Sequence, residues 1–194
     1  MLWFAFTWTT RVRGIGPVPG ALFAIAVPVL AGTLWLTLSI AGRRALAGVD
    51  VTPLVALHVT RWAGGMFLLL HAQGRLSDPF AFYAGWGDIL AAVTAVPAAV
   101  AAYRRSPGWP VWVLAWNVIG FGDFLLAIFF GVTSQPDLPF RLFFEPPGAA
   151  VLTEVPWRFI PAFYVPLFLI IHVALFVRLV PMLRPSRELL GTSH

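Results

Sequence analysis

The chain contains the stretch Gly85-Trp86-Gly87-Asp88-Ile89-Leu90-Ala91-Ala92 inside an apolar run that covers residues 83–103. A run of about 20 mostly apolar residues is long enough to cross a lipid bilayer as an α-helix. A carboxylate in hydrocarbon is costly unless it is neutral, paired or hydrated. Asp88 therefore marks a predicted membrane span and a candidate functional site at the same time.

Four other stretches have the length and composition of membrane spans. The five predicted spans cover residues 20–41, 52–72, 83–103, 109–132 and 158–180. They predict an all-α fold, a polytopic membrane helical bundle with five transmembrane helices, in which residues 1–194 form a single transmembrane domain. The longest connection, residues 133–157, is rich in proline and is expected to be a non-helical, extramembrane loop.

The composition agrees with a membrane protein. Hydrophobic residues make up 59% of the chain and charged residues 11%, against roughly 25% charged in soluble domains, and the mean hydropathy is +0.84. The net charge of +5 comes from arginines that stand beside apolar runs. That placement indicates contact with a lipid bilayer and no nucleic-acid partner. The absence of cysteine excludes disulfides and thiolate catalysis.

The arginines also predict an orientation. Those of the 42–51 loop, the 104–108 loop and the C-terminal segment outnumber those on the opposite side, so this side is expected in the cytoplasm, with the N-terminus outside and the C-terminus inside. All 13 basic residues are arginine, and alanine, glycine, proline and tryptophan are abundant, as in proteins of high-GC bacteria. We therefore expect a multi-pass protein of a bacterial inner membrane.

A second carboxylate, Asp123, closes the similar quartet Gly120-Phe121-Gly122-Asp123 in the fourth span. The third and fourth spans form a hairpin, so counting 1.5 Å per residue puts Asp88 and Asp123 at nearly the same depth. Arg61, near the middle of the second span, can reach that depth with its long side chain. We predict a buried polar cluster of Arg61, Asp88, Asn117 and Asp123.

A second polar layer is expected nearer the cytoplasmic side. It contains His58 of the second span, His172 of the fifth and Asn117 of the fourth. Two histidines at matched depth on different helices could serve as the axial ligands of a b-type haem, which we keep as an alternative. A histidine satisfied inside the bundle is the simpler interpretation. Apart from that alternative, no cofactor and no metal site are predicted.

The polar residues are compatible with a structural role, in which they fix helix register through interhelical contacts. The active role that fits them best is small-molecule or proton handling, because carboxylates, arginine and histidine within spans form ion and proton pathways. We expect no catalysis, although Asp88 and Asp123 remain the catalytic candidates. The sequence leaves open whether the protein forms a homo-oligomer.

The two quartets resemble the GxGD motif of intramembrane aspartyl proteases, the presenilin, signal-peptide-peptidase and prepilin-peptidase families. The resemblance covers about eight residues at each site. It implies a proteolytic dyad of Asp88 and Asp123 that shares a proton and activates water. Arg61 nearby argues against such a dyad, because it would hold both carboxylates ionised.

A longer resemblance covers residues 61–172. Its elements are Arg61-x-x-Gly64, Phe80-Ala81-x-x-Ala84-Gly85-x-Gly87-Asp88, Trp116-Asn117-x-x-Gly120-x-x-Asp123, and Ile160-Pro161-Ala162-Phe163-x-Val165-Pro166 followed by His172. This pattern is similar to a group of uncharacterised bacterial integral membrane proteins. The resemblance implies a membrane location and no assigned activity.

Overall fold

The computed structural model describes residues 20–136 and 141–183, and all regular structure in these residues is helical. The elements are α2 (Gly20–Leu38), α3 (Ile40–Gly48), α4 (Val51–Leu57), η1 (His58–Gly64), α5 (Gly65–Ala72), α6 (Phe80–Tyr103), α7 (Trp109–Thr133), η2 (Ala150–Thr153), η3 (Ile160–Tyr164) and α8 (Val165–Met182). α4, η1 and α5 follow one another without interruption, as do η3 and α8.

Four helical stretches are long and apolar enough to cross a membrane: Val51–Ala72, Phe80–Tyr103, Trp109–Thr133 and Ile160–Met182. Each coincides with one of the predicted spans. Large apolar side chains face outward from these helices, including Leu69, Leu90, Ile119 and Leu126, each more than half exposed. A contiguous apolar exterior of this kind is unusual for a soluble protein and is typical of a surface that meets lipid or another protein.

The first predicted span, residues 20–41, differs from the expectation. α2 ends at Leu38, and α3 leaves it at an angle of 88°. Ser39 causes the break, because its hydroxyl accepts a hydrogen bond from the Gly42 N–H at 2.8 Å and caps α3. The Arg43 guanidinium then donates to the carbonyl oxygens of Thr37 and Leu38 at 2.8 and 3.1 Å, which satisfies the end of α2.

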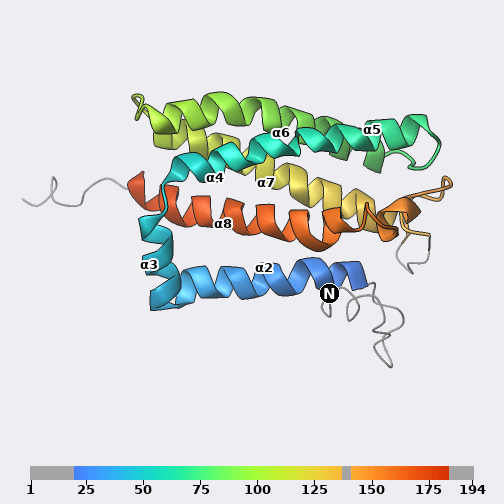
Figure 1. Cartoon of the computed structure of the whole chain (residues 1–194), viewed down its shortest axis with the longest axis horizontal. Helices are drawn as coiled ribbons and strands as arrows, with labels where there is room; N and C mark the ends of the chain where they lie inside the picture. The colour runs from blue at the N-terminus through green and yellow to red at the C-terminus, as the bar shows by residue number, and fades with distance from the viewer. Residues whose placement is uncertain (1–19, 137–140, 184–194) are drawn as a thin grey trace, which may run out of the picture.

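The long helices lie side by side along the long axis of the molecule, and α3 turns across one end of it (Figure 1). α6 packs against α7, η1, α5 and α4, while α7 also packs against α8. α2 stands at the edge and packs mainly against α8, η3 and α3. The main apolar core lies between α4, α6, α7 and α8, around Val55, Ala95 and Leu175.

The described residues of the 133–157 loop are mostly non-helical, as predicted, although α7 extends to Thr133 and the short 3₁₀ helix η2 lies within the loop. Its described part is fixed to the end of the bundle. Ser77 and Gly148 exchange two hydrogen bonds of 3.0 Å, and the Ala149 N–H donates to the Ser134 carbonyl oxygen at 3.1 Å. Leu152 and neighbouring residues pack on Phe80, so this loop closes one end of the helix bundle.

Candidate functional site

The middle of the second span is wound as a 3₁₀ helix, η1. A 3₁₀ helix has three residues per turn, so residues three apart stand directly above one another. His58, Arg61 and Gly64 therefore share one face, and all three are buried. The local winding aims the Arg61 side chain into the bundle, with a histidine on one side of it and a small residue on the other.

Arg61 joins α6 and α7 through two carboxylates. Its Nε and Nη2 lie 2.7 Å from Asp88 Oδ1, and Nη2 also donates to Asp123 Oδ2. Nη1 faces the Gly120 carbonyl oxygen at 3.5 Å, and the guanidinium carbon lies 4.0 Å from the centre of the Phe124 ring. The Arg61 side chain is 1% exposed, and both carboxylates are below one fifth exposed. The predicted ion cluster is present, with one cation bound to two anions.

Two glycines make this cluster possible. A β-carbon at Gly64 would collide with the Asp88 side chain, and one at Gly87 would collide with Asp123 Oδ1. The carboxylates therefore lie directly against helix backbone, which brings η1, α6 and α7 close together. The spacing Arg61-x-x-Gly64 and the quartet glycine before Asp88 were sequence signs of this close packing.

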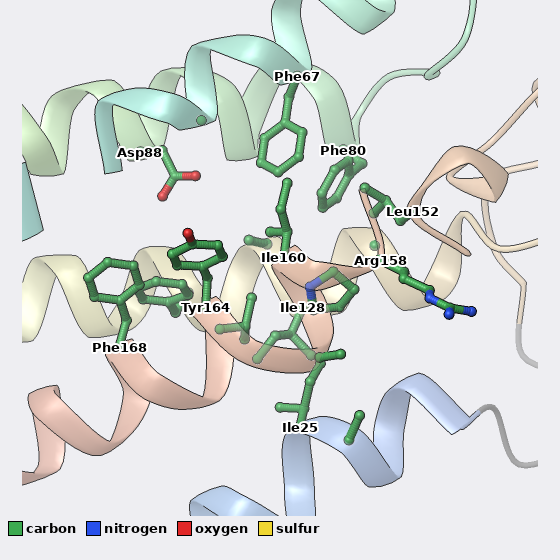
Figure 2. A pocket seen from close by; sticks show the side chains of 18 of the residues that line it. Ile25, Phe67, Phe80, Asp88, Ile128, Leu152, Arg158, Ile160, Tyr164 and Phe168 are labelled. Atoms are coloured by element: carbon green, nitrogen blue, oxygen red, sulfur yellow. The ribbon is translucent and has the colours of Figure 1, made fainter. Parts of the chain in front are cut away.

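Asp88 also stands at the wall of a cavity of about 560 Å³. Figure 2 shows its carboxylate pointing into the space that Tyr164 and Phe168 also border. The other walls are mostly apolar and come from α2, α5, the start of α6, α7, η2 and η3; they include Ile25, Phe67, Phe80, Ala127, Ile128, Leu152 and Ile160. Arg158 lines the opposite end, and its guanidinium points away from Asp88 (Figure 2).

The wall supplied by the last span owes its shape to two prolines. Pro161 and Pro166 are five residues apart; Pro161 lies in the π-helical turn η3 and Pro166 follows it in α8. At the end of this turn, the Val165 N–H bonds to the Ile160 carbonyl oxygen. Proline cannot donate a backbone hydrogen bond, so a wider turn accommodates the missing donors. π-helical turns are frequent at functional sites.

The second polar layer is built around His172. Asn117 donates from Nδ2 to the His172 carbonyl oxygen at 3.1 Å, and its Oδ1 accepts from His172 Nδ1 at 2.7 Å. Asn117 thus belongs to the histidine layer, as expected, but among the described residues it forms no hydrogen bond with the ion cluster, in which it was also expected. The ring of His58 lies 4.4 Å from that of His172, centre to centre. Both ring nitrogens of His58, and Nε2 of His172, are buried without a hydrogen-bond partner in the described part of the chain.

The two layers meet at Gly120. A β-carbon there would lie 3.4 Å from His172 Nε2 and 3.6 Å from Arg61 Nη1. The predicted layers are therefore neighbours inside one continuous polar region that runs along η1, α7 and α8.

This geometry does not fit a haem held between the two histidines. Imidazole nitrogens bond metals at about 2 Å, so rings on opposite sides of one iron have centres about 6 Å apart and need an open slot for the macrocycle. The rings of His58 and His172 are closer than that, and Trp116 and Phe168 pack around His58. Within residues 20–136 and 141–183, no three His, Asp or Glu side chains are grouped to hold a metal ion.

The geometry also differs from that of a proteolytic dyad. Both carboxylates accept hydrogen bonds from the same guanidinium, which stabilises the ionised form of each. An aspartyl dyad instead needs two carboxyl groups that share one proton. The site residues that the sequence did not single out are the ring of Phe124 under Arg61 and the aromatic pair Tyr164 and Phe168 at the cavity wall.

The fold and the site together define a class: an all-helical protein with helices apolar enough to span a membrane and a buried arginine that binds two aspartates beside an apolar cavity. The chain belongs to the family described as Domain of unknown function (DUF8737), whose model matches residues 18–180. No curated protein and no solved structure matches the chain.

Proposed function

We propose that this protein is an integral membrane protein that binds a small, mostly apolar molecule in the cavity beside Asp88. One observation carries the proposal: a cavity of about 560 Å³ has mostly apolar walls and one buried, charged end. Ligand sites typically have volumes of about 300–1,000 Å³, apolar walls and a few fixed polar groups. Both carboxylates are paired with Arg61, and this pairing fits a site that binds a molecule without covalent chemistry.

The membrane placement is part of the proposal. Four apolar helices and the bent pair α2–α3 cross a bacterial inner membrane, with the 104–108 turn in the cytoplasm and the turn after α5 outside. Because the chain has no cysteine, single cysteines report topology without background. In intact cells, Gln73→Cys should react with a membrane-impermeant maleimide and Ser106→Cys should react only after lysis. The reverse pattern would invert the orientation, and labelling of both in intact cells would contradict the span assignment.

The cavity is tested with a neutral apolar reagent, 3-trifluoromethyl-3-phenyldiazirine. Photolysis turns it into a carbene that inserts into neighbouring side chains, and mass spectrometry maps the sites. In the purified full chain in lipid nanodiscs, we expect labels on the buried cavity residues Phe67, Phe80 and Leu152, in addition to outward-facing residues. Labels confined to outward-facing residues would overturn the proposal.

A matched pair of variants locates the labels. Ala127 lines the cavity, whereas its neighbour Leu126 faces outward and is 52% exposed. Ala127→Phe should reduce labelling of Phe80 and Leu152 several-fold, and Leu126→Phe should leave it unchanged. If Ala127→Phe does not fold, Ala162→Phe blocks the same space from the opposite wall. Equal labelling in both members of the pair would contradict entry through this cavity.

Proton handling is the second candidate function, favoured by the two carboxylates that share one guanidinium next to the histidine layer. It predicts that liposomes containing the protein and an internal pH dye equilibrate an imposed pH gradient faster than empty liposomes, and that Asp88→Asn removes the difference. Equal rates for protein and empty liposomes would remove this candidate.

A further inference from the structure

We propose that the cavity binds an organic cation, an amine or a quaternary onium group with an apolar body, whose positive charge lies beside Asp88. This inference rests on the proposed function, because it names the class of molecule that the cavity takes. Three independent observations support it: the charge balance of the ion cluster, the commitment of the Arg61 donors, and the aromatic rings at the Asp88 end of the cavity.

The ion cluster has one positive and two negative groups. Arg61 is the one cation that pairs with Asp88 or Asp123 among residues 20–136 and 141–183. When both carboxylates are ionised, the cluster carries one excess negative charge in apolar surroundings. A buried charge of this kind requires a counter-charge. A cation in the cavity supplies one, because Asp88 and Arg61 both line the cavity and Asp88 is the anionic residue of the two.

Arg61 offers little to an anionic ligand. Its Nε and Nη2 are bound to the two carboxylates, its Nη1 faces the Gly120 carbonyl oxygen, and one face of the guanidinium lies on Phe124. By contrast, Asp88 Oδ2 accepts no hydrogen bond from any residue in the described part of the chain. The oxygen that the cluster leaves without a donor thus belongs to Asp88, a residue of the cavity wall, and a carboxylate oxygen is an acceptor for a cation.

Aromatic rings complete the cation site. Phe124 and Phe168 are stacked with centres 5.8 Å apart, and Phe168 and Tyr164 are stacked with centres 6.4 Å apart. Phe124 lies under Arg61, and all three rings line the cavity. Figure 2 shows the Asp88 carboxylate facing the part of the cavity that Tyr164 and Phe168 border. Ring faces attract cations, and aromatic residues beside a carboxylate are a common way to recognise ammonium groups. Arg61 on Phe124 already shows one cation bound to these rings.

The size of the cavity sets the size of the ligand. Its volume of about 560 Å³ accommodates a body of several rings or a branched chain, and its apolar walls extend from Asp88 toward the η2 end. The onium group therefore lies at the Asp88 end and the apolar body points toward Leu152.

The test uses two probes of nearly equal size and opposite charge, tetraphenylphosphonium and tetraphenylborate. Binding to the full chain in nanodiscs of zwitterionic lipid is measured by equilibrium dialysis, with empty nanodiscs subtracted. We expect saturable binding of about one tetraphenylphosphonium per chain and no saturable binding of tetraphenylborate. Asp88→Asn should weaken phosphonium binding at least tenfold, and Glu145→Gln, which removes an exposed carboxylate from the loop, should leave it unchanged.

If Asp88→Asn does not fold, Phe168→Leu tests the same site without changing its charge, and it should also weaken phosphonium binding. Preference for tetraphenylborate, or equal phosphonium binding in Asp88→Asn and the unmodified chain, would overturn the inference. Absence of phosphonium binding in a protein whose cavity is labelled by the neutral carbene would overturn the cation alone and retain the proposed function. Failure of the carbene labelling as well would overturn both.

Discussion

The charged layer and the histidine layer occupy the same helices but satisfy their polar groups in opposite ways. η1 contributes Arg61 to one and His58 to the other, and α7 contributes Asp123 and Asn117. Every charged group of the first layer has an ionic partner. In the second layer, three ring nitrogens have no partner within the described residues. A bundle of apolar helices thus accepts an unsatisfied neutral imidazole among aromatic rings, whereas each ion needs a counter-ion within reach.

Replacement of Arg61 should destabilise the charged layer, and it should lower the stability of the protein more than any substitution in the histidine layer. Arg61→Met leaves two buried carboxylates without a cation, and loss of one partner of a buried ion pair costs about 3–5 kcal/mol. Thermal unfolding of the purified protein in detergent, followed by circular dichroism, should show a large fall in Tm. Arg44→Met, at an exposed arginine of α3, is the matched control.

The same experiment has an internal rescue. The triple variant Arg61→Met, Asp88→Asn, Asp123→Asn removes all three charges together and should recover most of the lost stability. A Tm for Arg61→Met that equals that of the unmodified protein would show that the carboxylates need no cation, contrary to the proposed balance of the charged layer.

The two Gly-x-Gly-Asp quartets offer a second test, because the glycines directly before the aspartates, Gly87 and Gly122, have different surroundings. A β-carbon at Gly87 would collide with Asp123 Oδ1, whereas one at Gly122 would meet no atom within 4 Å. Gly87→Ala should therefore destabilise the protein by about 2–3 kcal/mol through overpacking. Gly122→Ala should cause no loss, since alanine is the better helix former. Equal melting temperatures of the two variants would contradict the close packing of α6 on the ion cluster.

The sequence predicted the charged layer because depth along a helix follows from counting residues. Asp88, Asp123 and Arg61 could be placed at one level from the span boundaries and the hairpin alone, and the structure joins them. The partner of Asn117 could not be chosen in this way. By depth Asn117 could belong to either layer, and only the packing of α7 on α8 directs its amide to His172.

The bend after α2 and the cavity were beyond the reach of sequence patterns. The run of residues 20–41 is apolar throughout, and hydropathy contains no information about a change of direction that depends on the hydrogen bonds of Ser39 and Arg43. The cavity has walls from five separate parts of the chain, so its position depends on how the helices pack. Pro161 and Pro166 were visible in the sequence, but the π-helical turn η3 that they produce at a cavity wall was not.

Within the histidine layer, substitution of His172 should lower the stability of the protein more than substitution of His58. His172→Phe removes the Nδ1 donor and leaves the buried Oδ1 of Asn117 unpaired, which should cost about 1–2 kcal/mol. His58→Phe loses no side-chain hydrogen bond to the described part of the chain and keeps an aromatic ring against Trp116 and Phe168, so its effect should be less than about 1 kcal/mol. Chemical denaturation in detergent measures both. The opposite ranking would show that His58 has a polar partner essential for the fold.

An exposed Arg–Asp pair, formed by Asp50 before α4 and Arg105 after α6, should have the smallest effect and sharpens the comparison with the buried cluster. Asp50 caps α4, where its Oδ1 accepts from the Thr52 N–H at 2.8 Å and its Oδ2 lies 3.0 Å from Arg105 Nη2. The hydrogen bonds from Thr52, and to a lesser extent the charge of Arg105, lower the pKa of Asp50 below 3.8. A carboxyl group with a lowered pKa in the folded state stabilises that state above pH 3.8, and the contribution is lost as the pH falls through the lowered value.

Asp50→Asn keeps the capping oxygen but does not titrate. The unmodified protein should therefore melt slightly above Asp50→Asn at neutral pH, and the difference should vanish in acid well below pH 3.8. A difference that is constant with pH would mean that the Asp50 charge adds nothing, in contrast to the charges around Arg61.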